Sequence, residues 1–549
     1  MAKLHPPALA LLVCQALACQ PCVSIDKPSD NPRPKGSIIV KRPPPSDWIT
    51  DWTLLIYAAN DDLDPNLVAA FDDDALEWQH GLGGSALFRI MVQRDYAPFQ
   101  LNSEDEPRPS ERYSVYREER HHPEHPPTVD APEAMLLGET DTTSSTTLRD
   151  FLVYGIRTFP ARHYWVTVTG HGDGFAGLAT DASAGPGRRL SIDGLSAALA
   201  EASAVIAAEI RTKPGYDGPD TSNRIDVVAF DACRLGTIEV AASVAQSADF
   251  MIASQESMPY AGHPYSALRF IAQDHPDASP RALVEAVVTD YVRAYVEGVS
   301  TAGRAYVGTS VTSVGLDLRR LSPLESALDE LASAVERSHP RGFTCTEVQA
   351  LLTEACHQAH VALPERQSVE MAGDAGLPRT QTTVAAAASV DLIALLEHMA
   401  QGPACLGAAP QNAASLGDIA KAARKALDII GRPPLWAPHN PSGVRFQYGG
   451  QYRKIVDFGP SSPFVVEAQR VDPDSNVRLG GLGVLWGNPF DLLLRENGKS
   501  LMDTYRTLPF DVRTGWTRMM RACIEEAEAC RTYEPSPDEP ISEGPCANF

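Results

Sequence analysis

Short continuous runs of apolar residues alternate along the chain with stretches in which apolar residues recur every three or four positions. Such short runs are typical of strands buried on both faces of a parallel sheet. The runs are Trp52–Ala58, Phe88–Gln93, Tyr164–Thr169, Ile225–Phe230 and Phe250–Ala253. Helical spacing is found in Val68–Trp78, Thr147–Thr158, Ile192–Ile210, Leu235–Ala245 and Pro280–Val296. This alternation predicts an α/β fold whose sheet is covered by helices on both faces.

The pattern continues with less regularity beyond residue 300, and no internal repeat is found. We predict a strand at Tyr306–Leu316, helices at Ser322–Val335, Asp391–Ala400 and Leu416–Ile430, a strand at Val444–Tyr448 and a helix near Thr514–Cys530. Proline, with 44 residues in the whole chain, is concentrated in three segments. These segments predict a tether at 19–47, a surface insertion at 104–133 and an acidic tail at 534–549. The main domain is expected at 48–460, followed by an extension at 461–533.

Charge excludes one large class of partners. The chain carries 47 basic and 70 acidic residues, a formal net charge of −23. A nucleic-acid-binding protein needs a basic surface to replace the counterions of the phosphate backbone, so we expect no nucleic-acid partner. No run of apolar residues is long enough to predict a membrane-spanning helix.

The first residues have the features of an export signal. Lys3 precedes a short apolar stretch that ends in small residues, which predicts a signal peptide at 1–18. The following Cys19 stands in a sequence similar to a bacterial lipobox, which predicts lipidation of Cys19 and anchoring of an exported bacterial protein to a membrane. Because Gln20 follows the cysteine, an outer-membrane lipoprotein is favoured, and simple secretion is the alternative.

An exported protein can form disulfides, and six of the ten cysteines lie beyond residue 340. We therefore expect up to three disulfides in that half of the chain, with connectivity left open. Cys523 and Cys530 are too far apart along a predicted helix to bond to each other. Cys233 stands apart from all of them.

Two predicted parallel strands end in residues that could carry chemistry. The strand Tyr164–Thr169 is followed by Gly170-His171-Gly172-Asp173-Gly174, and Ile225–Phe230 is followed by Asp231-Ala232-Cys233-Arg234. Ligands bind outside the carboxyl ends of parallel strands, so His171 and Cys233 are expected at one edge of the sheet. A helix beginning at Leu235 would place Cys233 near its positive end, which favours the thiolate.

Other interpretations of these residues exist. A single cysteine at a strand end is often a small buried hydrophobic residue, and a histidine in a glycine-rich turn is often solvated. The stretch Gly172–Gly177 also spells G-x-G-x-x-G. The residues after it contain Gly185, Pro186 and Gly187 and do not predict the helix that a dinucleotide site requires. No serine-hydrolase elbow or zinc-protease helix motif occurs.

Four stretches resemble the clostripain family of cysteine peptidases, which are relatives of caspases, gingipains and legumain. They are WTLLIYAANDDLD at 52–64, PARHYWVTVTGHGDG at 160–174, DVVAFDACRLGTIE at 226–239 and SQESMPYAGHPY at 254–265. The resemblance implies a caspase-like, mostly parallel sheet and a peptidase domain at 48–460. It also implies that His171 and Cys233 are the catalytic pair. Arg234 departs from the family's usual D-A-C-L-M, with an effect on the thiol that the sequence leaves undecided.

The resemblance also implies a specificity and a reaction. The family cleaves after Arg or Lys, and Asp231 is similar to the acidic residue at the floor of its S1 pocket. The alternative role for Asp231 is a helix N-cap. Cys233 would attack the scissile carbonyl, His171 would protonate the leaving amine, and the N–H groups of Gly172 and Cys233 would form the oxyanion hole.

Two further expectations concern processing and metals. Several relatives cut themselves between the catalytic His and Cys, which implies self-cleavage after Arg188 or Arg189, with Arg211 and Lys213 as alternatives. No metal is required for the chemistry. Clostripain itself depends on calcium, so calcium stays open, but the turn Asn60-Asp61-Asp62 with Asp64 lacks the spacing of an EF-hand and is expected to be solvated.

The sequence thus predicts an exported cysteine endopeptidase that acts on proteins or peptides with basic residues at the cleavage position. The alternative is a catalytically silent binding lipoprotein that retains the peptidase fold.

Overall fold

The protein is described by a computed structural model. It describes residues 49–62, 64–78, 88–97, 99, 109–115, 135–185, 187–218, 224–265, 278–301, 304–306, 311–351, 389–401, 413–431, 445–448, 451–457, 464–472, 481–486, 493, 495–496 and 499–531. The expected signal peptide, the tether, residue Cys19 and the acidic tail lie outside these residues. In the described part of the chain, every helix is too short or too polar to cross a bilayer.

A mixed sheet forms the centre of the fold and contains 11 strands within the described residues. Its inner strands run parallel in the order β9-β8-β5-β1-β2. They are β9 (Ala248–Ala253), β8 (Ile225–Asp231), β5 (Ala161–Thr169), β1 (Thr50–Ala58) and β2 (Phe88–Arg94). Each contains one of the apolar runs, so the predicted α/β class with a parallel sheet is confirmed.

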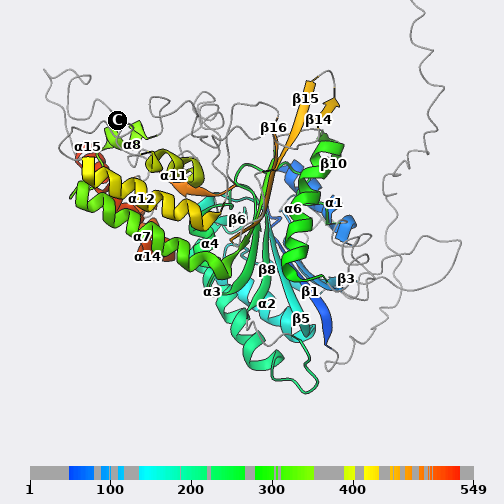
Figure 1. Cartoon of the computed structure of the whole chain (residues 1–549). Coiled ribbons are helices and arrows are strands. Elements are labelled where there is room, and N and C mark those ends of the chain that lie inside the picture. Colours follow the sequence, from blue (N-terminus) through cyan, green and yellow to red (C-terminus); the bar gives the residue numbers. More distant parts are fainter. Residues whose placement is uncertain are drawn as a thin grey trace, which may run out of the picture. The chain divides into compact units, whose positions relative to one another are not determined.

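Alternate residues of the inner strands face two separate cores. In β1, Leu55 and Tyr57 belong to a core that also contains side chains of α2 (Ser145–Thr158), α3 (Ile192–Val205) and α4 (Ile238–Val244). Leu54 and Ile56 belong to a second core with α1 (Pro65–Glu77) and α6 (Pro280–Glu297). Figure 1 shows the sheet between these two layers of helices. The strands read as continuous apolar runs because both of their faces are buried.

Antiparallel strands extend the sheet on both sides. Beyond β9 follow β12 (Val311–Asp317), β16 (Val465–Asp472), β15 (Gln451–Asp457) and β14 (Arg445–Tyr448), and beyond β2 follow β3 (Ser110–Val115) and β4 (Met135–Gly138). Strand β3 lies within 104–133, so part of the proline-rich segment belongs to the sheet. The strand expected at Tyr306–Leu316 is divided between β11 (Arg304–Tyr306), which pairs with β10 (Val299–Thr301), and β12.

Small hairpins and short helices complete the described structure. The hairpins are β6 (Leu178–Thr180) with β7 (Arg189–Leu190), β13 (Ser389–Asp391) with β17 (Gly483–Leu485), and β18 (Arg495–Glu496) with β19 (Lys499–Ser500). Short helical turns are η2 (Gly174–Ala176), η3 (Ile206–Ile210), η4 (Leu318–Arg320) and η7 (Trp516–Met520). The π-helical η3 continues α3, so the helix predicted at Ile192–Ile210 has the expected length.

We call the helices α7, α8 and α11 to α15, together with η7 and the β13/β17 hairpin, the C-terminal assembly. The helices are α7 (Leu321–Ser338), α8 (Cys345–Ala350), α11 (Leu392–Ala400), α12 (Ala413–Ile430), α13 (Leu501–Tyr505), α14 (Pro509–Thr514) and α15 (Arg521–Arg531). Trp486, Trp516 and Phe343 are fully buried in the same core as α2, α3 and α4. A disulfide joins Cys345 to Cys523.

The chain beyond residue 460 is continuous with the rest of the fold. Strand β16 pairs with β12 inside the central sheet. The buried carboxylate of Glu239 in α4 accepts hydrogen bonds from Leu485 N at 2.7 Å and from the Tyr505 hydroxyl at 2.8 Å. Described residues of the expected extension therefore contribute to the core on one side of the sheet.

Candidate active site

The ends of β5 and β8 bring His171 and Cys233 to one edge of the sheet. The two strands pair in parallel, with Thr169 opposite Asp231 as the last pair. His171 and Cys233 each lie two residues beyond this pair, and Gly170 N donates to Asp231 O at 3.2 Å where the strands separate. The predicted juxtaposition at the carboxyl ends of neighbouring parallel strands is therefore present.

The two turns touch through Gly172. A Cβ built on this glycine would lie 2.3 Å from Cys233 O and 3.1 Å from Cys233 N, so only glycine permits this approach. Within the described residues, neither Gly172 N–H nor Cys233 N–H donates a hydrogen bond. Two neighbouring N–H groups without an acceptor are able to stabilise a developing oxyanion.

His171 has a carboxylate partner that the sequence did not identify. Its Nε2 lies 3.2 Å from Asp62 Oδ2, and the His171 side chain is 43% exposed. Asp62 follows β1, which pairs with β5 on the side opposite β8. Burial alone would raise the pKa of Asp62, but hydrogen bonds from His171 and from Asp64 N–H lower it below its usual value. Asp62 is therefore ionised and can orient the imidazole ring.

The thiol of Cys233 is half-buried and belongs to no disulfide. Met258 N donates to Cys233 Sγ at 3.3 Å, so the segment after β9 lies against the thiol. Among the described residues, no hydrogen bond joins Cys233 to the His171 ring. Catalytic hydrogen bonds are often long or absent before substrate binds, and the arrangement is consistent with a dyad.

The turn after Cys233 differs from the sequence expectation. Helix α4 begins at Ile238 rather than Leu235, and its N-cap is Thr237. Cys233 is thus five residues before the helix, too far for the helix dipole to act on the thiol strongly. The following Arg234 has a φ of +61°, a left-handed conformation that is strained for a residue other than glycine. Such strain is common beside functional groups because it fixes their direction.

The side chain of Arg234 is engaged in an ion pair. Its Nη1 lies 3.4 Å from Asp173 Oδ1, and Arg189 Nη1 lies 2.5 Å from Asp173 Oδ2. Asp173 is buried, and burial raises its pKa although the two guanidinium groups oppose that shift. Asp173 thus connects the turn that carries His171, the turn that carries Cys233 and strand β7.

Asp231, the residue expected to bind a basic substrate side chain, lies beneath the segment after β9. Its Oδ2 accepts hydrogen bonds from the Tyr265 hydroxyl at 2.9 Å and from His263 N at 3.2 Å. A Cβ on Gly262 would lie 2.6 Å from the Asp231 carboxylate. The alternative role as an N-cap is wrong, because α4 starts seven residues later with Thr237 as its cap. Within the described residues, no basic side chain pairs with Asp231.

The two arginines expected at the self-cleavage site differ in their surroundings. Arg188 is 53% exposed and pairs with Asp141 at 2.7 Å. Arg189, which lies in β7, is 17% exposed and pairs with Asp173 at 2.5 Å. Gly185 and Gly187, which precede Arg188, both have positive φ values. Arg188 is therefore the more accessible of the two.

The turn after β1 was expected to be solvated, and for its first two residues this is wrong. Asn60 and Asp61 are both 0% exposed. Asp61 lies in a group of acidic side chains with Asp95, Glu139 and Asp181. Burial, together with repulsion within the group, raises the pKa of Asp61 and Glu139 and raises that of Asp95 to about 8. The group is compatible with calcium, which the resemblance left open.

These features define a class: an α/β fold of the caspase-like type with a cysteine and a histidine at one edge of a parallel sheet. The profile of the clostripain family matches residues 92–368, which is slightly more than half of the chain and includes His171 and Cys233. The chain belongs to the clostripain family. No curated protein sequence matches it.

Solved structures of C11 cysteine proteases have a similar fold. A secreted C11 protease from Bacteroides thetaiotaomicron, solved with an irreversible peptide inhibitor, is 16% identical and has a TM-score of 0.50. An inactive zymogen C11 protease from Parabacteroides distasonis is 15% identical and has a TM-score of 0.47. Each similarity covers 85% of this chain and 99% of the solved chain. The first of these confirms the predicted caspase-like fold.

Two site residues escaped the sequence analysis for different reasons. Asp62 was recognised only as part of a polar turn. The feature that could have identified it is that it follows β1, the strand beside the one that precedes His171. Asp173 stands next to Gly172, and no pattern in the sequence links it to Arg189 and Arg234. Ion pairs between distant segments depend on how the strand ends meet.

Proposed function

We propose that this protein is a cysteine endopeptidase that cleaves after Arg or Lys with Cys233 as nucleophile and His171 as acid and base. This proposal rests mainly on one observation. The turns that hold these residues are in contact at Gly172, beside two N–H groups without an acceptor in the described structure. A buried structural cysteine would require neither a close glycine contact nor free N–H groups.

The chemical steps follow from these positions. The Cys233 thiolate attacks the scissile carbonyl carbon, and the oxyanion accepts hydrogen bonds from Gly172 N–H and Cys233 N–H. His171 donates its proton to the leaving amine, and Asp62 keeps the ring oriented. Water then attacks the thioester with His171 as base, which releases the acyl group as a carboxylic acid and regenerates the thiol of Cys233. These steps require no cofactor, as is general for this family.

For specificity, we propose that Asp231 attracts the basic side chain of the substrate. The residue is two positions before Cys233, and no Lys or Arg side chain of the described structure forms an ion pair with it. The segment with Met258, Gly262 and His263 lies over both Cys233 and Asp231. Substrate entry therefore requires this segment to move away from Asp231.

Covalent labelling tests the proposed peptidase function. We expect a peptide electrophile with a terminal arginine or lysine to modify Cys233, and Cys233→Ala to remove labelling and hydrolysis without changing the unfolding temperature. A matched electrophile ending in alanine serves as control. Hydrolysis that persists in Cys233→Ala would contradict the mechanism and favour the silent binding protein.

The variant Asp231→Asn tests the proposed specificity for basic residues. Asp231→Asn keeps the size of the side chain and its ability to accept hydrogen bonds from Tyr265, but removes the charge. We expect kcat/KM for arginyl substrates to fall by about 100-fold, while the low activity on alanyl substrates stays unchanged. An unaltered ratio of arginyl to alanyl turnover would return Asp231 to a purely structural role.

Self-cleavage is proposed after Arg188, with Arg189 less favoured because Asp173 and β7 hold it. Denaturing gels and amino-terminal sequencing should detect a new terminus at Arg189 in the active protein and a single chain in Cys233→Ala. Arg188→Ala should remove this cut. Equal cutting of Cys233→Ala would assign it to another protease.

Anchoring is proposed through Cys19. We expect the full chain to partition with membranes and Cys19→Ser to release it, because stable anchoring needs more than one acyl chain. A wild-type protein found only in the soluble fraction would favour simple secretion.

A further inference from the structure

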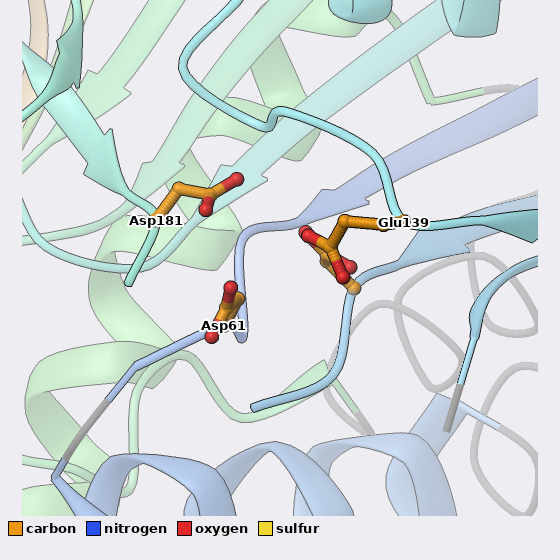
Figure 2. A group of neighbouring side chains, drawn as sticks. Asp61, Glu139 and Asp181 are labelled. Atoms are coloured by element: carbon orange, nitrogen blue, oxygen red, sulfur yellow. The ribbon is translucent and has the colours of Figure 1, made fainter. Parts of the chain in front are cut away.

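Four carboxylates from different segments meet near the end of β1. Asp95, Glu139 and Asp181 are each the first residue after a strand, namely β2, β4 and β6, and Asp61 follows β1. One oxygen from each lies within 4.8 Å of the others. Figure 2 shows the side chains of Asp61, Glu139 and Asp181 directed toward a common space. The ends of three strands of the central sheet and of one strand of the β6/β7 hairpin thus bring together four carboxyl groups that are far apart in sequence.

Two oxygens of this group are buried without a partner. Asp61 Oδ1 and Asp95 Oδ2 have no hydrogen-bond partner within the described residues, and their residues are 0% and 1% exposed. The other oxygens of these side chains are used, since Ser183 N donates to Asp61 Oδ2 at 2.9 Å and the Ser110 hydroxyl donates to Asp95 Oδ1. Burying a carboxylate oxygen without a hydrogen-bond donor costs free energy. A ligand that binds these two oxygens would remove that cost.

Basic side chains do not compensate this charge. Among the described residues, no Lys, Arg or His forms an ion pair with Asp61, Asp95, Glu139 or Asp181. The nearby Arg188 pairs with Asp141 instead. A buried group of like charges without a counterion requires either protonation or a bound cation.

We propose that Asp61, Asp95, Glu139 and Asp181 bind one hard divalent cation of the size of calcium. Two oxygens bound to one calcium ion at about 2.4 Å can be no more than about 4.8 Å apart, which agrees with the spacing of this group. The donors are all carboxylate oxygens, which calcium prefers over the nitrogen and sulfur ligands of zinc. Exposed Glu139 leaves a path for entry and room for water ligands.

The proposed ion would connect the catalytic histidine to the self-cleavage segment. On one side, Asp61 precedes Asp62, which lies against His171 and accepts a hydrogen bond from Thr180 at 2.9 Å. On the other side, Asp181 begins the segment that ends at Arg188. Ala182 N donates to Asp61 O at 3.0 Å, so the two segments are already joined at this point.

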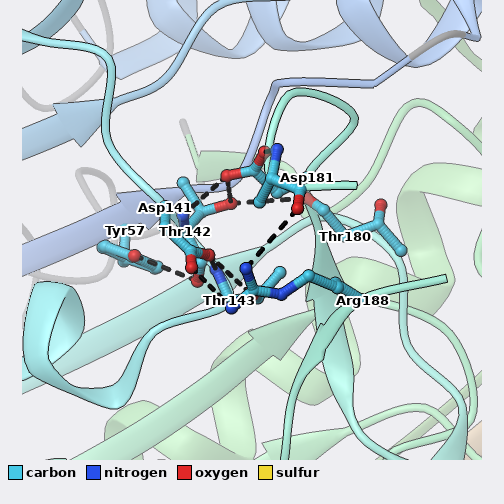
Figure 3. A network of polar contacts seen from close by, with 8 residues as sticks. Tyr57, Asp141, Thr142, Thr143, Thr180, Asp181 and Arg188 are labelled. Atoms are coloured by element: carbon cyan, nitrogen blue, oxygen red, sulfur yellow. Dashed lines mark hydrogen bonds and ion pairs between the residues drawn. The ribbon is translucent and has the colours of Figure 1, made fainter. Parts of the chain in front are cut away.

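The segment before Arg188 is fixed by the same carboxylates. Asp181 accepts hydrogen bonds from Ala184 N at 2.6 Å and from Thr142 N at 2.8 Å. Arg188 pairs with Asp141, the neighbour of Thr142, as Figure 3 shows. An ion that holds Asp61 and Asp181 together would therefore order this segment and the turn that positions His171.

Binding can be measured without relying on peptidase activity. Calorimetric titration of the full chain carrying Cys233→Ala, freed of metal by a chelator, with CaCl₂ should give one site per chain. We expect a dissociation constant of about 10⁻⁵ to 10⁻³ M and a rise in unfolding temperature of about 2–6 °C at saturation. This variant cannot cut itself, so a failure of the peptidase proposal would leave this measurement unaffected.

Glu139→Gln is the decisive variant because its side chain is exposed and its loss should leave the fold intact. We expect it to weaken calcium binding at least about tenfold, and the exposed Asp418→Asn on α12 to have no effect. Magnesium at equal concentration should give a smaller shift, because it demands shorter bonds and keeps its water. Absence of binding, unchanged affinity in Glu139→Gln, or an equal response to magnesium would overturn the proposal.

Limited trypsin digestion tests the connection to the self-cleavage segment. In the Cys233→Ala chain, calcium should slow cutting after Arg188 by about tenfold or more, since binding stabilises the segment's folded form. Cutting after Arg211 or Lys213 serves as internal control and should not change. Equal rates at Arg188 with and without calcium would refute the proposed ordering of this segment.

Discussion

The β1/β5/β8 edge and the C-terminal assembly use opposite means to hold their side chains. The edge consists of turns rich in buried charge, with Asp61, Asp62 and Asp173 close to the histidine and cysteine turns. The C-terminal assembly is apolar, with Trp486 and Trp516 packed edge to face and a disulfide nearby. Chemistry requires polar groups that are costly to bury, whereas stability comes from apolar burial. The polar edge and the apolar assembly come from different parts of the sequence. Helix α4 joins them, because its Glu239 binds Leu485 and Tyr505.

The largest difference between the regions should be found with His171→Ala. We expect kcat/KM to fall by at least about 10³-fold, because a nucleophile and its acid and base act as one unit. The unfolding temperature should stay within about 2 °C of wild type, since the His171 side chain is partly exposed and fills no core. Steady-state kinetics and calorimetry measure both. A large loss of stability would mean that the edge also supports the fold.

The opposite pattern is expected when the disulfide of the C-terminal assembly is removed. It closes a separation of 178 residues, so replacing both Cys345 and Cys523 by serine should lower the free energy of unfolding by about 2–5 kcal/mol. Denaturant unfolding measures the loss. At a temperature where the variant is folded, kcat/KM should be close to wild type, and a proportional loss of activity would show that the assembly shapes the site.

A smaller effect is expected from Asp62→Asn, which alters a positioning residue. We expect kcat/KM to fall by about 10- to 100-fold, with the loss mainly in kcat rather than in KM, because the carboxylate orients the imidazole ring for proton transfer. Asp51→Asn, near the start of β1, is the matched control and should preserve kcat. A fall in unfolding temperature that accounts for the loss of activity would indicate a purely structural role.

The smallest effect concerns Glu239, which joins α4 to the C-terminal assembly. Burial raises its pKa, although hydrogen bonds from Leu485 N–H and Tyr505 partly oppose the shift. Because the folded state holds this proton more tightly than the unfolded state, stability is lost as the pH rises through the folded pKa. Thermal unfolding from about pH 5 to about pH 8 should therefore show a shallower decline in Glu239→Gln than in wild type. If the unfolding temperatures of the two proteins changed equally with pH, a raised pKa of Glu239 would be contradicted.

The central fold could be predicted because its signal is local. Each inner parallel strand is buried on both faces and so appears as a continuous apolar run, while helices such as α2 and α6 show their spacing within one segment. The strand β3 was missed because it lies at an edge, in a segment whose prolines and charges favour a loop interpretation. The start of α4 was placed too early because Leu235 is apolar, although Gly236 and Thr237 already mark the turn and the cap.

For the site, the sequence by itself identified His171 and Cys233 as candidates and put them at one edge, because parallel strands align their carboxyl ends. The residues that act on them were decided by the tertiary structure alone. Asp62 reaches His171 only because β1 lies beside β5, and Arg189 reaches Asp173 only through the β6/β7 hairpin. The four carboxylates near Asp61 share no spacing in the sequence. A contact between segments depends on the packing of whole elements, and that information is absent from any short stretch of the chain.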